Sequence, residues 1–179
     1  MKIFGLVGWS GSGKTTLVTA LLPELIGRGY TVSTMKHTHH NFDIDKKGKD
    51  SFEHRIAGAT EVLITGSSRW AILHENRNAP EPLIEQLLNR MEDVDLVLIE
   101  GFKSYRHQKL EVFRPALGKS LLAGEDQTIV AVASDAQESE LTGLVAKNVV
   151  LINLDNIKVI ADFIVLHTGL EVEGRNGST

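Results

Sequence analysis

A glycine-rich stretch near the start of the chain has the residue types and spacing of a phosphate-binding loop. Residues 8–15 read Gly-Trp-Ser-Gly-Ser-Gly-Lys-Thr and fit the pattern G-x-x-x-x-G-K-(S/T). Its glycines allow the backbone to curl so that successive N–H groups point at the phosphates of a nucleotide. Lys14 is expected to reach the β- and γ-phosphates, and Thr15 to hold Mg²⁺. This stretch therefore predicts nucleotide binding.

The elements that must position this loop are also visible in the sequence. An apolar run at residues 3–7 predicts a buried strand before it, and the apolar-rich segment that follows predicts a helix ending near residues 27–29. The positive N-terminal end of that helix would face the phosphates. A glycine-rich turn with a purely structural role is the alternative. The candidate nucleotide-binding residues here are Gly11, Ser12, Gly13, Lys14, Thr15 and Thr16.

A second motif typical of nucleotide-binding proteins is an acidic residue at the end of the apolar strand predicted at residues 95–99. The strand ends in Glu100 and a glycine, and an acid at such a position contacts Mg²⁺ directly or through water. We therefore assign Glu100, together with Lys14, to the catalytic candidates, and Glu100 with Thr15 to the Mg²⁺ site. Asp95 competes for the metal role but lies at the opposite end of the strand. The alternative for Glu100 is that it only caps the next segment.

Asp135 is a candidate for recognition of the nucleotide base, and it follows the apolar strand predicted at residues 128–133. A carboxylate there can accept both N1–H and the exocyclic N–H of guanine, whereas adenine offers no such pair of donors. The alternative is that Asp135 caps a following helix. The usual guanine signature N-K-x-D is absent from the sequence. Asn153 and Asp155, after the last predicted strand, are further candidates at the base.

Two basic or polar segments could bind a second ligand. Residues 36–51 form a long polar loop dense in ionisable groups, and a solvated loop without function is the alternative. Its lysines could bind an anion, its aspartates could act through Mg²⁺ or water, and its histidines could ligate a transition metal. Three basic residues after Glu100 could hold a further anionic ligand. These candidates are Lys36, Lys49, Asp43, Asp45, His37, His39, His40, Lys103, Arg106 and Arg114.

The composition of the chain excludes several classes of protein. With 179 residues and 42% hydrophobic content, the chain is expected to form one nucleotide-binding domain over residues 1–179, with a frayed tail from about residue 170. A formal net charge of -4 argues against nucleic-acid binding. The absence of cysteine excludes disulfides and thiolate metal sites and suits the cytoplasm. The apolar runs are all shorter than a membrane span, so no membrane partner is expected.

The order of elements predicts an α/β fold with a mostly parallel central sheet. A β-hairpin is expected at residues 61–65 and 69–74, with Trp70 half-buried, and a helix at residues 80–91. Ser51 is expected to cap a short helix at residues 52–57.

Several motifs together resemble the MobB family of molybdopterin-guanine dinucleotide biosynthesis adapter proteins. The resemblance implies a three-layer P-loop NTPase fold, and a dimeric protein that binds GTP with Mg²⁺ and has weak GTPase activity. It also implies an accessory role beside the guanylyltransferase MobA in attaching GMP to molybdopterin. Gly11, Gly13, Lys14, Thr15, Thr16, Glu100 and Asp135 match the functional positions. The motifs that carry the resemblance are residues 8–16, 36–40, 43–45, 48–51, 100–103 and 133–135.

Two other functions remain open at this point. In a small-molecule kinase of the same fold, Asp43 or Asp45 would position an acceptor hydroxyl, and Lys49 or Arg55 would bind the anionic part of the acceptor. In a metal-delivery GTPase, the histidines of residues 37–40 would carry the metal. Position 9 is a tryptophan and not an extra lysine, so a lysine donated across a dimer is not supported.

Overall fold

The computed structural model describes residues 1–38, 42–103 and 105–170. It divides into two compact units, one formed by Met1–His37 with Asp93–Thr179 and the other by Thr38–Glu92. The expectation of a single nucleotide-binding domain over residues 1–179 stays a prediction. The tail predicted to be frayed lies, from residue 171 onward, outside the described residues. In the described part of the chain, no helix is long and apolar enough to cross a membrane.

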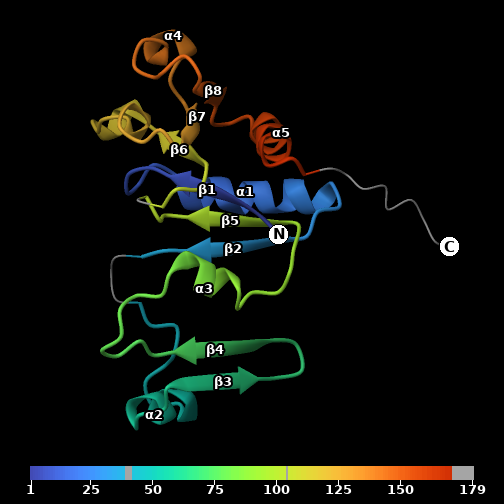
Figure 1. Ribbon diagram of the computed structural model, residues 1–179, viewed down its shortest axis with the longest axis vertical. Helices are drawn as coiled ribbons and strands as arrows, with labels where there is room; N and C mark the ends of the chain where they lie inside the picture. Colours follow the sequence, from blue (N-terminus) through green and yellow to red (C-terminus); the bar gives the residue numbers. More distant parts are fainter. Residues whose placement is uncertain (39–41, 104, 171–179) are drawn as a thin grey trace, which may run out of the picture. The chain divides into compact units, whose positions relative to one another are not determined.

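The first unit is built on a six-stranded sheet with the strand order β2-β5-β1-β6-β7-β8 (Figure 1). Every neighbouring pair in it is parallel, which confirms the predicted α/β class. Because β1 lies between β5 and β6, the loop after β1 is flanked by the carboxyl ends of both neighbours, where ligands bind in open α/β sheets. The strands are β1 Lys2–Val7, β2 Val32–Lys36, β5 Leu96–Glu100, β6 Lys109–Phe113, β7 Ile129–Ser134 and β8 Val150–Asn153.

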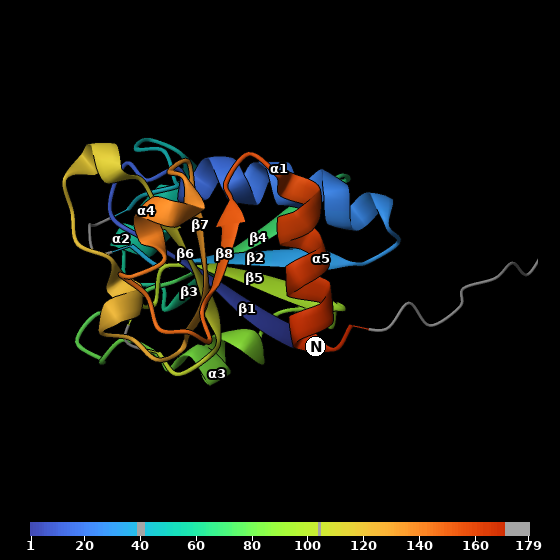
Figure 2. The ribbon, with the colours of Figure 1, turned by 90° about the horizontal axis from the view of Figure 1, so that it is seen from above.

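Helices α1 (Lys14–Gly27) and α5 (Ile157–Thr168) pack against one face of this sheet and contact each other (Figure 2). Leu21 and Leu25 of α1 and Ile164 of α5 are buried in one apolar cluster with Phe4 and side chains of the other strands. A second cluster covers the opposite face, where it includes residues of the short helices η2 (Leu122–Gly124) and α4 (Glu138–Leu141). The chain therefore buries its central strands from both sides, as their continuous apolar runs predict.

Strand β6 is a buried central strand that the sequence analysis did not predict. Its two charged residues, Lys109 and Glu111, are fully buried. Lys109 Nζ donates to Tyr105 O, to Thr128 Oγ1 and, at 3.1 Å, to Asp126 Oδ2. The carboxylate of Glu111 accepts from the backbone N–H groups of residues 122 and 123, both at 2.9 Å. These bonds tie the segment after β6 to the sheet, so the charges are satisfied inside the protein.

His107 lies next to this strand and packs directly over β1. A Cβ atom built on Gly5 would come within 2.3 Å of His107 Nε2, so only glycine leaves room for the ring. Burial, assisted by the positive charge of Lys109, lowers the pKa of His107 to about 4. The imidazole is therefore neutral at pH 7 and acts as a packing group.

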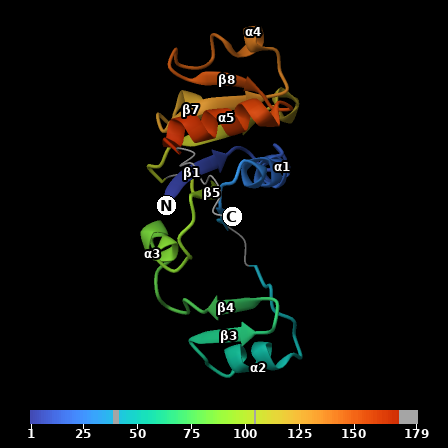
Figure 3. The ribbon, with the colours of Figure 1, turned by 90° about the vertical axis from the view of Figure 1, so that its right-hand side faces the viewer.

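The second unit contains an antiparallel hairpin of β3 (Glu61–Thr65) and β4 (Trp70–His74), with α2 (Asp50–Ile56) against β3 (Figure 3). This confirms the hairpin predicted at residues 61–65 and 69–74. The helix α3 (Ile84–Leu88) is shorter than predicted. Trp70 is 59% exposed, so its predicted half-burial is wrong. The predicted cap at Ser51 is also wrong. Helix α2 begins at Asp50 with Lys49 as its N-cap, and Ser51 Oγ donates to Asp45 Oδ1 at 2.8 Å.

Candidate functional site

The predicted phosphate loop connects β1 to α1 at the carboxyl edge of the sheet. Gly13 is the N-cap of α1 and has φ 98°, and Gly11 has φ 80°, both in the left-handed region that glycine enters without strain. A Cβ on Gly8 would lie 2.4 Å from the carbonyl oxygen of Val112 in β6. These glycines therefore satisfy two needs, the curl of the loop and its close approach to β6.

The side chain of Lys14 lies across the loop. Its Nζ donates to Gly8 O at 3.1 Å and to Trp9 O at 2.9 Å. Burial lowers the pKa of Lys14, while the negative charge of Glu100 acts in the opposite direction. Ser12 is 1% exposed, and within the described chain its Oγ has no hydrogen-bond partner. A cationic amine and a buried hydroxyl in the same curled loop are groups that an anion would satisfy.

Glu100 is brought to this loop because β5 pairs directly with β1. In the register of the two strands, Leu6 lies opposite Glu100. Thr15 Oγ1 donates to Glu100 Oε1 at 3.0 Å, with Oε2 at 3.3 Å. Lys36, at the end of β2, places its Nζ 3.5 Å from Oε1. A hydroxyl beside a carboxylate offers the hard oxygen ligands that Mg²⁺ takes in nucleotide sites.

The competing acid, Asp95, has a different environment. It precedes β5 at the opposite edge of the sheet, and its Oδ2 accepts from both the N–H and the hydroxyl of Thr31 at 2.7 Å. These bonds join the starts of two neighbouring strands. The position of Asp95 thus agrees with the sequence argument that put it away from the phosphate loop.

Asp135 lies beside Arg114, a pairing that the sequence analysis missed. Arg114 follows β6, and its Nε donates to Ser12 O in the phosphate loop at 3.0 Å. Its Nη1 forms an ion pair with Asp135 Oδ2, just after β7. The alternative that Asp135 caps α4 is wrong, since the N-cap of α4 is Gln137. The signal in the sequence was weak, because the two residues are 21 positions apart.

A cavity of about 410 Å³ opens at the carboxyl ends of β7 and β8. Asp135 and Asn153, both named as candidates for the base, line it, together with Ser134 and Leu141. Asn153 Oδ1 accepts from the backbone N–H of Asp155 at 2.8 Å. The cavity therefore adjoins the same acid that holds Arg114.

Two lysines lie close to the ring of Trp9 in the phosphate loop. The indole N–H of Trp9 donates to Ser120 O at 2.8 Å, and Lys103 Nζ lies 4.4 Å from the ring centre. Lys119 Nζ is 5.7 Å from the same ring. Arg106 lines a separate cavity of about 390 Å³ with Lys103. Positive charge is thus gathered near the loop although the whole chain is acidic.

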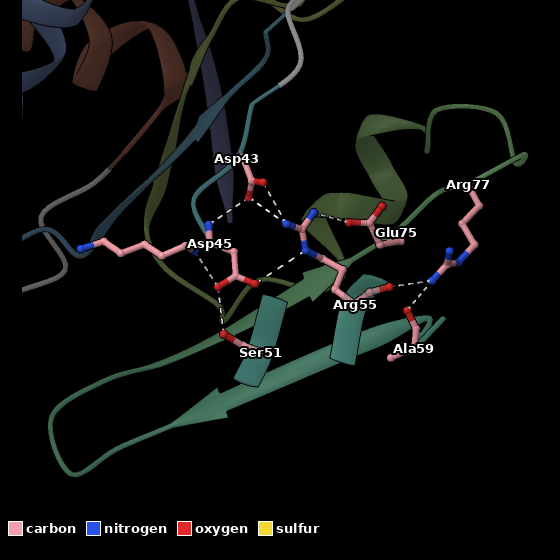
Figure 4. A network of polar contacts seen from close by, with 8 residues as sticks. Asp43, Asp45, Ser51, Arg55, Ala59, Glu75 and Arg77 are labelled. Atoms are coloured by element: carbon pink, nitrogen blue, oxygen red, sulfur yellow. Dashed lines mark hydrogen bonds and ion pairs between the residues drawn. The ribbon is translucent and has the colours of Figure 1, made fainter. Parts of the chain in front are cut away.

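In the second unit, residues of the polar loop join a network centred on Arg55 (Figure 4). Arg55 Nη2 donates to both oxygens of Asp43 at 2.9 and 3.0 Å, and Nη1 donates to Glu75 Oε1 at 2.8 Å. Asp45 Oδ2 lies 3.7 Å from Arg55 Nε. The backbone N–H of Asp45, and then Arg55, lower the pKa of Asp43. The network links the loop to α2 and to the residue after β4, which accounts for these charged residues structurally.

The candidate transition-metal site cannot be placed as a whole. His39 and His40 lie outside the described residues. Among the residues that are described, no group of three or more His, Cys, Asp or Glu is arranged to hold a metal ion. His37 instead packs its ring against Phe102, with the ring centres 4.4 Å apart.

The family model for MobB, "Molybdopterin guanine dinucleotide synthesis protein B", matches residues 3–135. The match includes the phosphate loop, Glu100 and Asp135. The chain belongs to the MobB family.

Known MobB proteins match over nearly the whole chain. The chain is 37% identical over 170 residues to the molybdopterin-guanine dinucleotide biosynthesis adapter protein of Escherichia coli, with 92% of each chain covered. It is 38% identical over 167 residues to the adapter protein of the same name from Haemophilus influenzae, covering 92% of this chain and 88% of that one. These relatives confirm the resemblance drawn from the motifs.

Solved MobB structures share the fold. A crystal structure of molybdopterin-guanine biosynthesis protein B superimposes with a TM-score of 0.69 at 25% identity, covering 92% of this chain and 99% of that one. Bacillus subtilis MobB gives a TM-score of 0.69 at 22% identity, covering 96% of this chain and all of that one.

Proposed function

We propose that this chain is a GTP-binding adapter protein that assists the conversion of molybdopterin into molybdopterin guanine dinucleotide. Membership of the MobB family and the names of the E. coli and H. influenzae relatives support the pathway. The observation that carries the nucleotide part is the contact between Thr15 Oγ1 and Glu100 Oε1, 3.0 Å long, beside Lys14. It brings the two predicted Mg²⁺ ligands together at the mouth of the phosphate loop.

In this proposal the backbone of residues 11–16 binds the phosphates, and Lys14 neutralises their negative charge. Thr15 and Glu100 hold Mg²⁺, which when bound offsets further charge on the phosphates. Asp135 reads the guanine base at the cavity that opens at the carboxyl ends of β7 and β8. The same groups give the protein a weak Mg²⁺-dependent GTPase activity, with Lys14 and Glu100 as its catalytic residues. GTP and Mg²⁺ are thus the proposed cofactors.

The proposed partners are molybdopterin or its guanine dinucleotide, the guanylyltransferase MobA, and a second copy of the chain. Support for a homodimer comes from the hairpin of the second unit. There Leu63 and Trp70 are 60% and 59% exposed, and Ile72 is 43% exposed. Apolar side chains gathered on one exposed hairpin are typical of a protein–protein interface. We propose a cytoplasmic location, where the biosynthetic partners would be met.

The experiment adds the purified protein to a reaction that contains molybdopterin, Mg²⁺, GTP and the guanylyltransferase. Wild-type protein is expected to raise the yield of molybdopterin guanine dinucleotide. Glu100→Gln removes a charged Mg²⁺ ligand, so about ten times more protein is expected to be needed for the same effect. The measured quantity is the yield of dinucleotide as a function of protein concentration.

The matched control is Glu140→Gln, which removes the same charge from an exposed position on α4. This variant is expected to raise the yield of dinucleotide at the same protein concentration as wild type does. If Glu100→Gln assists the reaction as well as wild type does, the proposed Mg²⁺ role of Glu100 is wrong. If wild type itself has no effect on the yield, the adapter role is wrong.

A further inference from the structure

We propose that Arg114 and Asp135 form a positioning pair that holds the phosphate loop in its ligand-binding shape. Asp135 would then serve the phosphate end of the nucleotide as well as the guanine base. The inference rests on the proposed nucleotide function and adds to it a residue, Arg114, that the loop motif does not contain.

The first step of the argument is the contact between Arg114 and the loop. Arg114 Nε donates to the carbonyl oxygen of Ser12 at 3.0 Å. That carbonyl and the N–H of Gly13 belong to the same peptide group. Because the N–H groups of such a loop face the phosphates, a cation on the carbonyl side fixes the direction of the Gly13 N–H. It also polarises the peptide and makes this N–H a stronger donor.

The guanidinium group also lies on the side of Gly13 where a side chain would project. A Cβ atom built on Gly13 would lie 3.7 Å from both Nε and Nη2 of Arg114. Gly13 has φ 98°, a conformation that glycine reaches easily but that it can also leave easily in a free loop. The hydrogen bond from Arg114 Nε to Ser12 O restrains the peptide group that precedes Gly13 and so restricts that freedom. Arg114 therefore supports the part of the loop that the sequence makes most flexible.

The second step is the anchor that Asp135 provides. Asp135 Oδ2 pairs with Nη1 of Arg114, so one guanidinium bridges the acid and the loop. The two residues follow neighbouring parallel strands, with Phe113 of β6 opposite Ser134 of β7. The sheet thus sets the distance between them. An arginine can make both contacts at once because its donors are fixed in a plane, which a lysine amine cannot reproduce.

Partial exposure of the pair indicates a positional role. The side chains of Arg114 and Asp135 are each 35% exposed, and ion pairs near solvent add little to folding stability. Loss of the pair is therefore expected to change ligand binding more than the stability of the protein.

The test uses inorganic tripolyphosphate with Mg²⁺, a ligand that has the phosphates of GTP but no base. Its affinity and that of GTP are measured for wild type, Arg114→Ala, Asp135→Asn and the double variant. Each single substitution is expected to weaken tripolyphosphate binding about tenfold. The double variant is expected to lose no more than a single one, because residues that act as one unit are not additive.

Two controls separate positioning from general damage. Thermal unfolding of each variant is expected to occur within about 2 °C of wild type, in keeping with the small stability of exposed pairs. Lys147→Ala, which removes one positive charge at an exposed position, is expected to bind both ligands as wild type does.

The outcomes distinguish the inference from the proposed function. If Asp135→Asn weakens GTP binding but leaves tripolyphosphate binding unchanged, Asp135 only reads the base and the positioning pair is wrong. Additive losses in the double variant would also overturn the pair. If wild type binds neither ligand, the proposed nucleotide function fails and the inference fails with it.

Discussion

Lys14→Ala is expected to weaken the binding of Mg²⁺–GTP by about 100-fold. The Lys14 amine lies across the phosphate loop, 3.1 Å from Gly8 O and 2.9 Å from Trp9 O. From this position it can donate to phosphate oxygens at the loop mouth. Charge-assisted hydrogen bonds contribute about 1.5 kcal/mol each, and the loss of two corresponds to about two orders of magnitude in affinity. Isothermal titration of GTP into the two proteins measures the change directly.

Lys147→Ala is the matched control for charge, since it removes a lysine from an exposed position between α4 and β8. Its GTP affinity is expected to equal that of wild type. An affinity of Lys14→Ala within twofold of wild type would show that the loop is not where the triphosphate binds. Trp9, located in the loop itself, offers a fluorescence signal for the same titration.

Lys109→Met is expected to lower the free energy of unfolding by about 3 kcal/mol. Lys109 is fully buried, and its amine donates to Tyr105 O, Asp126 and Thr128. Methionine fills a similar volume but leaves these acceptors without their donor. Burial pushes the pKa of Asp126 upward, but hydrogen bonds from Thr128 and Lys109 outweigh it and hold the pKa below its usual value. The variant therefore leaves the charged carboxylate of Asp126 with its hydrogen bonds from Thr128 but without its cationic partner.

Urea unfolding at pH 7, with the fluorescence of the two tryptophans as the signal, measures this loss. The double variant Lys109→Met with Asp126→Asn is expected to recover part of it, because no unpaired charge remains. Lys2→Met, at an exposed position at the start of β1, is expected to change the free energy of unfolding by less than about 0.5 kcal/mol. If Lys109→Met is as stable as wild type, the buried contacts of Lys109 do not stabilise the fold.

The part of the site that the sequence predicted depends on local pattern. An apolar strand, a glycine-rich loop and a helix occur consecutively, so residues 8–15 could be placed on their elements without knowledge of the fold. Glu100 followed from the same reasoning, since it ends an apolar run. Its contact with Thr15 needed only the further rule that the carboxyl ends of parallel strands meet at one edge.

The parts that were missed depend on contacts between distant residues. Strand β6 carries Lys109 and Glu111. Lysine and glutamate are rarely buried without a partner, so a segment that contains both, with no partner visible nearby in the sequence, indicates a surface position. Apart from Tyr105 O, the partners that make their burial possible follow 11 to 19 residues later. Arg114 was likewise grouped with nearby basic residues, because its pairing with Asp135 becomes visible only when β6 and β7 lie side by side.

Side-chain exposure in the second unit was also missed for a physical reason. Trp70 has the residue type of a core position and lies in a strand, and both features favour burial. The hairpin, however, forms a two-stranded sheet of its own, and the side chains of Leu63, Trp70 and Ile72 on it are exposed. Residue type alone does not distinguish such an exposed strand position from a buried one.

The most direct test of the nucleotide proposal is a crystal structure of the protein with a non-hydrolysable GTP analogue and Mg²⁺. We expect density for the triphosphate along the backbone of residues 11–16, with Lys14 Nζ on a phosphate oxygen and the metal between Thr15 and Glu100. Nucleotide density at any other place, with residues 11–16 free of phosphate, would contradict the account.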